Sequence, residues 1–113
     1  MTKQRGDWAE DLAAAFLTRH GLRVIVRNYR CRSGEIDLVL RDGTALVFAE
    51  VRMRHDKNFG GAAESITAAK QRRIIHAARH YLAGLGNPPP CRFDAVLLTG
   101  SHDIEWIRDA FGE

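Results

Sequence analysis

Apolar residues recur at helical spacing in two stretches of the chain. The first runs up to His20-Gly21, where glycine can adopt the left-handed conformation that closes a helix. The second lies between Thr67, which can cap its N-terminus, and Gly84, after which a run of prolines follows. The pattern predicts two helices. Residues 55–66 keep no period, and we expect them to form a mobile connection.

Strand spacing fills most of the remaining sequence. Residues 22–32 alternate apolar and polar side chains, which is typical of a strand at or near the edge of a sheet, with one face in water. Residues 92–99 form an almost continuous apolar strand interrupted by Asp94, which we expect to pair with a neighbouring arginine. Residues 104–107 can add a last short strand. Helices and strands in this order predict an α/β fold.

The segment from Glu35 to Arg54 consists of two apolar runs joined by Asp42-Gly43, the strongest turn signal in the chain. If these two residues form the turn, Arg41 faces Thr44 and the register of the hairpin is set. One face of the hairpin is then entirely apolar, and we assign it to the core. That face holds Ile36, Leu38, Leu40, Ala45, Val47, Ala49, Val51 and Met53.

The opposite face of this hairpin gathers acidic residues. Glu35 falls directly across from Glu50, and Asp37 falls diagonally from it, at Cα separations of about 5 and about 7–8 Å. Like charges at these distances destabilise a sheet unless a positive charge lies between them. A hard divalent cation with oxygen ligands, Mg²⁺ or Mn²⁺, meets that need. The spacing therefore predicts a metal site formed by Asp37 and Glu50.

A solvated hairpin face is the alternative interpretation of the same pattern. The acids would then form surface ion pairs with Arg30, Arg52 or Arg54, each contributing roughly 0–1 kcal/mol. Leu46 and Phe48, however, make the acidic face half apolar. Something is therefore expected to cover this face, and covered charges need partners. This favours a cleft over an open surface.

The two predicted helices can add side chains to the acidic face. Glu10 lies about 20° beyond the apolar arc of the first helix and can point along the sheet, although a plain surface role fits equally well. Lys70 and Gln71 lie inside the apolar arc of the second helix and face inward, although a lysine that only extends to solvent gives the same pattern. Arg72 and Arg73 face outward. They can bind the phosphates of a nucleic acid, although a helix face that is simply solvated would show the same pattern.

Length and composition bound the class of protein. With 113 residues and a mass of 12.7 kDa, the chain is expected to form one domain over residues 1–113. No apolar run approaches the roughly 20 residues of a membrane span. No secretory signal is recognised either, so we expect a cytoplasmic protein without a membrane partner. The two cysteines lack the spacing of a zinc site or a disulfide framework.

The cationic residues add a weak indication of nucleic-acid binding. Fourteen of the seventeen are arginine, whose guanidinium group matches the oxygens of a phosphate. The formal net charge of +3 is moderate and is shared by many proteins with other partners. Charge alone therefore does not identify the ligand.

Six short motifs carry a resemblance to a known family. They are Gly6 to Glu10, Asn28-Tyr29-Arg30, Gly34-Glu35-Ile36-Asp37-Leu38, Phe48-Ala49-Glu50-Val51-Arg52, Lys70-Gln71-Arg72-Arg73 and Arg92-Phe93-Asp94. Together they resemble the YraN family of small bacterial proteins, from about Arg5 to Phe111. That family is similar to the restriction-endonuclease-like superfamily and to archaeal Holliday junction resolvases. The resemblance implies a mixed central sheet flanked by helices.

The resemblance also implies roles for individual residues. The superfamily's helix glutamate corresponds to Glu10, and its two strand acids correspond to Asp37 and Glu50, so these three would hold Mg²⁺ or Mn²⁺. The superfamily's lysine, two residues after the second acid, corresponds to Arg52. Arginine stays protonated and cannot activate water, so Arg52 would bind a phosphate or stabilise charge in the transition state. Lys70 is our candidate for activating the attacking water.

The leading hypothesis is a metal-dependent nuclease that acts on DNA, with branched or flapped DNA among the candidate substrates. One alternative is a nucleic-acid-binding module that has lost catalysis, for which Arg52 is the main argument. Another is a protein-interaction subunit. Similarity to resolvases also raises the prospect of a homodimer. The residues expected to contact nucleic acid are Arg30, Arg54, Gln71, Arg72 and Arg73.

Overall fold

The computed structural model describes residues 5–54, 66–99 and 103–112. The connection expected over residues 55–66 therefore lies outside the described residues, except for Ile66. The helices are α1 (Arg5–Arg19) and α2 (Ala68–Ala83), and the strands are β1 (Arg23–Cys31), β2 (Gly34–Asp42), β3 (Ala45–Met53), β4 (Cys91–Leu98) and β5 (Ile104–Phe111).

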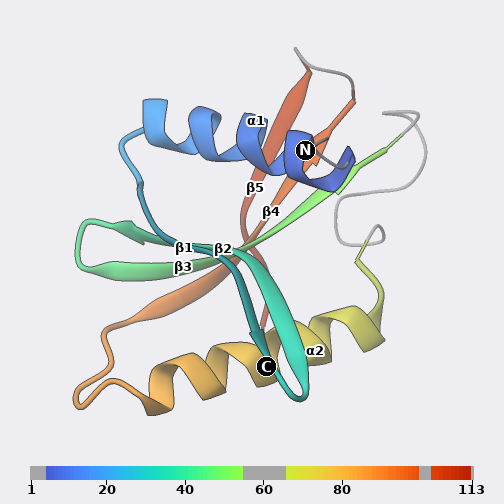
Figure 1. Ribbon diagram of the computed structural model, residues 1–113. Coiled ribbons are helices and arrows are strands. Elements are labelled where there is room, and N and C mark those ends of the chain that lie inside the picture. The colour runs from blue at the N-terminus through green and yellow to red at the C-terminus, as the bar shows by residue number, and fades with distance from the viewer. Residues whose placement is uncertain (1–4, 55–65, 100–102, 113) are drawn as a thin grey trace.

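The strands form one mixed sheet in the order β1-β2-β3-β4-β5. Neighbouring strands are antiparallel except for β3 and β4, which are parallel because α2 lies between them in the chain and returns it to the same end of the sheet. Figure 1 shows α1 on one side of the sheet and α2 on the other. The predicted α/β class, the flanked mixed sheet and the edge position of the first strand are confirmed. The arrangement is compatible with a restriction-endonuclease-like fold.

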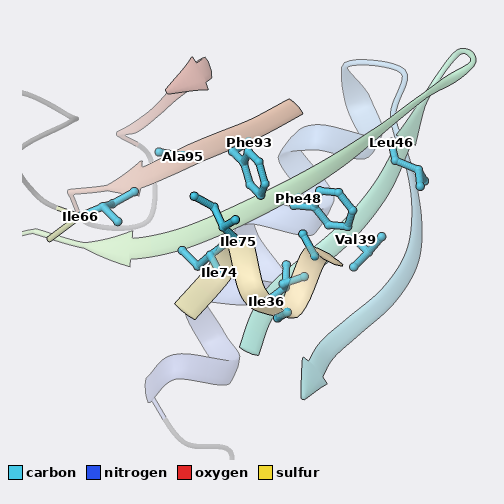
Figure 2. Close-up of a cluster of buried hydrophobic side chains, with 11 residues drawn as sticks. Ile36, Val39, Leu46, Phe48, Ile66, Ile74, Ile75, Phe93 and Ala95 are labelled. Carbon is cyan, nitrogen blue, oxygen red and sulfur yellow. The ribbon is translucent and has the colours of Figure 1, made fainter. Parts of the chain in front are cut away.

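Each helix covers a separate hydrophobic core. Figure 2 shows the core beneath α2, where Phe48, Ile74 and Phe93 lie among aliphatic side chains. The core beneath α1 contains Leu17, Leu38 and further aliphatic residues of β3 and β4. The acidic face of the hairpin is thus covered by a helix, as its apolar residues predict. Among the described residues, neither helix is long and apolar enough to cross a membrane.

The ends of α2 follow the local sequence. The Thr67 side chain accepts a hydrogen bond from the Lys70 backbone N–H at 3.1 Å, which satisfies one of the unpaired donors of the first turn. At the other end the helix stops at Ala83, and Gly84 is its C-cap. Both predicted helix boundaries are confirmed. The cap also fixes the turn from which Lys70 projects.

The hairpin turn differs from its prediction by one residue. Asp42 pairs with Ala45, so Gly43 and Thr44 form the two-residue turn, and Gly43 has a φ of 61°. A positive φ at the first turn residue fits a type II′ turn with glycine in that place. Asp42 remains in β2, where its carboxylate lies 2.9 Å from Arg92 Nη2. The register is consequently shifted by two residues, which leaves the faces of most side chains unchanged.

The hairpin separates at its open end. Strand β2 pairs with β3 only from Leu38 to Asp42, although β2 pairs with β1 from Gly34 to Arg41 and β3 pairs with β4 from Leu46 to Met53. In Figure 1, β1 and β2 bend towards α2 while β3 continues in another direction. The bend turns Ile36 into the core beneath α2, so its predicted placement beside Leu38 is wrong. Met53, also assigned to the core, is 41% exposed.

Strand β5 is longer than the short strand predicted at residues 104–107. Its pairing with β4 shifts register opposite Asp94, where Asp109 adopts a φ of 54°. The Asp94 carboxylate accepts a hydrogen bond from the Asp109 backbone N–H at 2.9 Å. This bond satisfies a donor of the bulge and allows pairing to continue to Phe111. The expected partner of Asp94 is also present, since Arg92 Nε lies 3.0 Å from it.

Gly34 sets how closely β2 approaches α2, and its replacement by alanine is expected to destabilise the protein. A Cβ atom at Gly34 would lie 1.9 Å from the Arg73 carbonyl oxygen, so the helix would have to move. We expect the free energy of unfolding to fall by about 1–3 kcal/mol in urea denaturation. Gly86→Ala is the matched control, because nothing lies within 4 Å of its Cβ position. Equal losses for the two variants would contradict the close packing.

Candidate active site

Asp37 lies where β2 and β3 separate. Its Oδ2 atom accepts a hydrogen bond from the Val51 backbone N–H at 2.8 Å, so the carboxylate replaces a backbone partner at the point where the ladder ends. The Glu50 side chain is 3% exposed and lies beside Asp37, which raises its pKa through hydrogen bonding and charge. The predicted juxtaposition of these two acids is confirmed. It arises from the split in the hairpin rather than from the diagonal pairing that the sequence suggested.

The Glu50 carboxyl group has a strongly altered acidity. Its pKa is raised to about 8, first by burial, then by the hydrogen bond to Asp37 and by the charge of that residue. The cations Lys70 and Arg52 act in the opposite direction without cancelling the shift. Near neutral pH the pair of acids therefore retains a proton. Nearby positive charge is insufficient to hold both groups as carboxylates.

Two cationic side chains lie beside Glu50. Arg52 Nη1 and Lys70 Nζ are each 3.7 Å from Glu50 Oε2. The predicted inward orientation of Lys70 is thereby confirmed. Its Nζ atom also lies 3.5 Å from Glu35 Oε1. These separations exceed the about 2.7–2.9 Å of a direct charge-assisted hydrogen bond, so neither cation is locked to the buried carboxyl group.

The raised pKa of Glu50 predicts a pH-dependent gain in stability for Glu50→Gln. Between pH 4.5 and about 8 the unfolded state ionises Glu50 while the folded state does not, so wild-type stability falls through this window. Glutamine does not titrate, and the variant escapes this loss. Without divalent metal, we expect the variant to exceed wild type by about 2–4 kcal/mol at neutral pH.

Urea denaturation of both proteins from pH 4 to pH 9, with chelator present, measures this effect. The difference in unfolding free energy should be small at the acidic end, grow with pH, and level off above the pKa of Glu50. Titrating groups that do not interact with Glu50 are common to both proteins and cancel in the difference. A difference that does not change with pH would contradict the raised pKa.

Glu10 approaches from α1 and is 7% exposed. Its Oε1 atom accepts a hydrogen bond from Asn28 Nδ2 at 2.9 Å and lies 3.6 Å from Arg27 Nη2. Over the ranges that the structure describes, no three His, Cys, Asp or Glu side chains form a metal-binding group. The structure thus does not bring Glu10 into such a group with Asp37 and Glu50, and its role as a metal ligand stays a prediction. Asn28 belongs to one of the six sequence motifs but was assigned no role in the site, and its φ of 54° is one that asparagine tolerates better than most residues.

Three of the predicted nucleic-acid contacts lie on accessible surface near the acids. The Arg30 side chain is 73% exposed, and its Nε atom lies 3.4 Å from Glu35 Oε2. Arg72 and Arg73 are exposed on α2, and the Arg73 carbonyl group packs against the start of β2. Arg30 thus lies beside Glu35, which also contacts Lys70, while Arg72 and Arg73 are exposed residues of the helix that carries Lys70.

Two other predicted contacts are occupied within the protein. Arg54 donates from Nε to Thr99 Oγ1 at 3.0 Å and from Nη2 to Glu105 Oε1 at 2.6 Å, and its side chain is only 13% exposed. Gln71 donates its amide to the Ile66 carbonyl group at 3.0 Å. In the structure Arg54 connects strands and Gln71 holds Ile66 just before α2, and their contact with nucleic acid stays a prediction.

Comparison with known proteins decides the family. A model described as "Uncharacterised protein family UPF0102" matches residues 9–98. The chain belongs to this family. It is the family indicated under the name YraN by the sequence motifs, and that prediction is confirmed.

Relatives in the UPF0102 family cover nearly the whole chain. A UPF0102 protein of Nitrosospira multiformis is 61% identical over 95% of this chain and 92% of its own length. One from Nitrosomonas europaea is 59% identical over 96% of this chain and 94% of its own length. One from Cupriavidus taiwanensis is 62% identical over 95% of this chain and 82% of its own length.

The donor set of this UPF0102 chain fits a hard divalent cation. Asp37 and Glu50 supply carboxylate oxygens from two adjacent, fixed positions. Mg²⁺ is commonly held by only one or two carboxylates and keeps water or substrate phosphate as its other ligands, so a third protein ligand is not required. The proton retained by Glu50 is one that a cation can displace. Asp37 and Glu50 are thus the residues that would hold the metal.

Proposed function

We propose that this UPF0102 chain is a metal-dependent nuclease that hydrolyses phosphodiester bonds in DNA. The observation that carries the proposal is the adjacent pair of acids Asp37 and Glu50, placed where a hairpin splits and flanked by Lys70 and Arg52. Buried acids without full compensation by cations are costly to the fold. Such an arrangement is typical of a functional site.

Each residue of the site has a distinct proposed task. Asp37 and Glu50 would hold Mg²⁺ or Mn²⁺, which supplies Lewis-acid stabilisation of charge on the phosphate and activation of water. Arg52 is 38% exposed beside Glu50 and would bind a non-bridging phosphate oxygen. Lys70 would orient the attacking water and, once its ammonium group has released its own proton, accept the proton of that water, which arginine cannot do. Arg30, Arg72 and Arg73 would contact the phosphate backbone outside the site.

A cleavage assay with a matched variant tests this function. Wild type and Glu50→Gln, purified in parallel, are incubated with duplex, single-stranded and branched DNA in Mg²⁺, Mn²⁺ or chelator. We expect cleavage of at least one substrate by wild type, only with metal, and none by the variant. Equal cleavage by both proteins would identify a contaminant. Intact DNA in every reaction would contradict nuclease activity.

Arg52 favours a second candidate, a module that binds nucleic acid without cleaving it. A guanidinium in the place of the superfamily's lysine binds phosphate but transfers no proton. This candidate predicts salt-sensitive binding of DNA that is the same with and without metal and is unaffected by Asp37→Asn. A binding constant that does not change with salt would instead indicate a protein partner.

A further inference from the structure

Two carboxylates share the Lys70 ammonium group. Its Nζ atom lies 3.5 Å from Glu35 Oε1 and 3.7 Å from Glu50 Oε2. The inner partner, Glu50, is 3% exposed, whereas the outer partner, Glu35, is 35% exposed. Lys70 is therefore placed between a buried acid at the centre of the site and a second acid at its rim.

The position of Glu35 is fixed by its neighbours. It follows Gly34, where β2 packs closely against the Arg73 carbonyl group of α2. Arg73 lies about one helical turn after Lys70, so this contact holds Glu35 close to Lys70. On its other side, Glu35 Oε2 lies 3.4 Å from Arg30 Nε, and the two residues are paired across β1 and β2. Glu35 is thus held between two cations rather than free to leave the rim.

This geometry matters when a cation binds to Asp37 and Glu50. A divalent ion repels the Lys70 ammonium group and competes with it for Glu50. With Glu35 present, Lys70 keeps a carboxylate partner on its outer side and remains beside the site. When Glu35 loses its charge, Glu50 is the remaining carboxylate of the two ion pairs described above, so Lys70 competes more strongly with the metal for Glu50.

We infer that Glu35 is a positioning residue that draws Lys70 off Glu50, so that the metal gains the carboxylate and Lys70 stays within reach of the reacting phosphate. The inference rests on the proposed function and adds a residue with no contact to the metal. It predicts that Glu35 acts on metal affinity through Lys70. A purely electrostatic contribution of Glu35 would act whether or not Lys70 is charged.

A double-mutant cycle separates these two effects. Mn²⁺ affinity is measured by isothermal titration calorimetry for wild type, Glu35→Gln, Lys70→Met and the double variant, with circular dichroism as a check on folding. We expect Glu35→Gln to weaken Mn²⁺ binding about five- to tenfold in the wild-type background and less than about twofold in the Lys70→Met background. Glutamine has the size of glutamate and the site is at the rim, so the fold should be retained.

Each outcome of this cycle has a distinct meaning. An equal loss of affinity in both backgrounds, or no loss in either, would overturn the inference and leave the metal site intact. If neither wild type nor Lys70→Met binds Mn²⁺, the proposed function fails, and the role of Glu35 fails with it.

Discussion

Replacing Lys70 with methionine is expected to lower kcat for DNA cleavage by about 100-fold or more, while Mn²⁺ binding is retained. Lys70 Nζ lies 3.7 Å from Glu50 Oε2, and lysine, unlike arginine, can take and release a proton. Arg52 lies at the same distance from the same oxygen but stays protonated. The loss should therefore appear in the chemical step rather than in metal binding.

Two further variants test whether the effect on kcat depends on proton transfer by Lys70 or only on its charge. Lys70→Arg keeps the charge but not the ability to accept a proton, and we expect it to be as slow as Lys70→Met. Arg79→Met removes a cation from the exposed part of the same helix and should leave kcat close to that of wild type. Full activity of Lys70→Arg would show that the charge of the side chain suffices and would contradict its role in activating water.

Replacing Asp94 with alanine is expected to give a large loss of stability. Asp94 is fully buried and accepts hydrogen bonds from Arg92 Nε at 3.0 and 3.2 Å, from Trp106 Nε1 at 2.9 Å and from the Asp109 backbone. Its removal leaves these donors without their acceptor and a guanidinium group without its inner partner. The free energy of unfolding should fall by about 3–5 kcal/mol, a large share of the total for a small domain.

The matched control for Asp94 is Asp42→Ala, which removes the outer acid of the same arginine. Asp42 Oδ2 lies 2.9 Å from Arg92 Nη2, and its side chain is 35% exposed. Solvent screening limits such a pair to about 1 kcal/mol. Urea denaturation of the two variants should therefore give clearly different midpoints. Similar midpoints would contradict a structural role for the buried acid.

The sequence predicted the features that depend on local chemistry. Thr67 and Gly84 bound α2 because capping involves only neighbouring residues. The apolar side chains of Leu46 and Phe48 predicted that another element covers the acidic face, and α2 is that element. The prediction that Asp37 and Glu50 share a face survived the error in the turn, because a register shift of two residues preserves the faces of a strand.

Features that depend on distant residues were not predicted. The sequence Asp42-Gly43 is compatible with a turn at Asp42-Gly43 or at Gly43-Thr44. The structure has the second turn, in which Asp42 stays in β2 and forms an ion pair with Arg92 of β4. The length of β5 depends on Asp94, a residue of another strand, which stabilises the bulge at Asp109. No spacing in the sequence relates Glu35 to Lys70, because their contact depends on how α2 packs against β2.

The central claim is that Asp37 and Glu50 hold one divalent cation, and Mn²⁺ binding to wild type and Asp37→Asn tests it most directly. Calorimetric titration at pH 8, near the pKa of Glu50, measures affinity and stoichiometry without any assumption about substrate. We predict one saturable site in wild type and an affinity weaker by about 10–100-fold in the variant. Equal affinity in the two proteins, or no saturable binding to wild type, would contradict the claim.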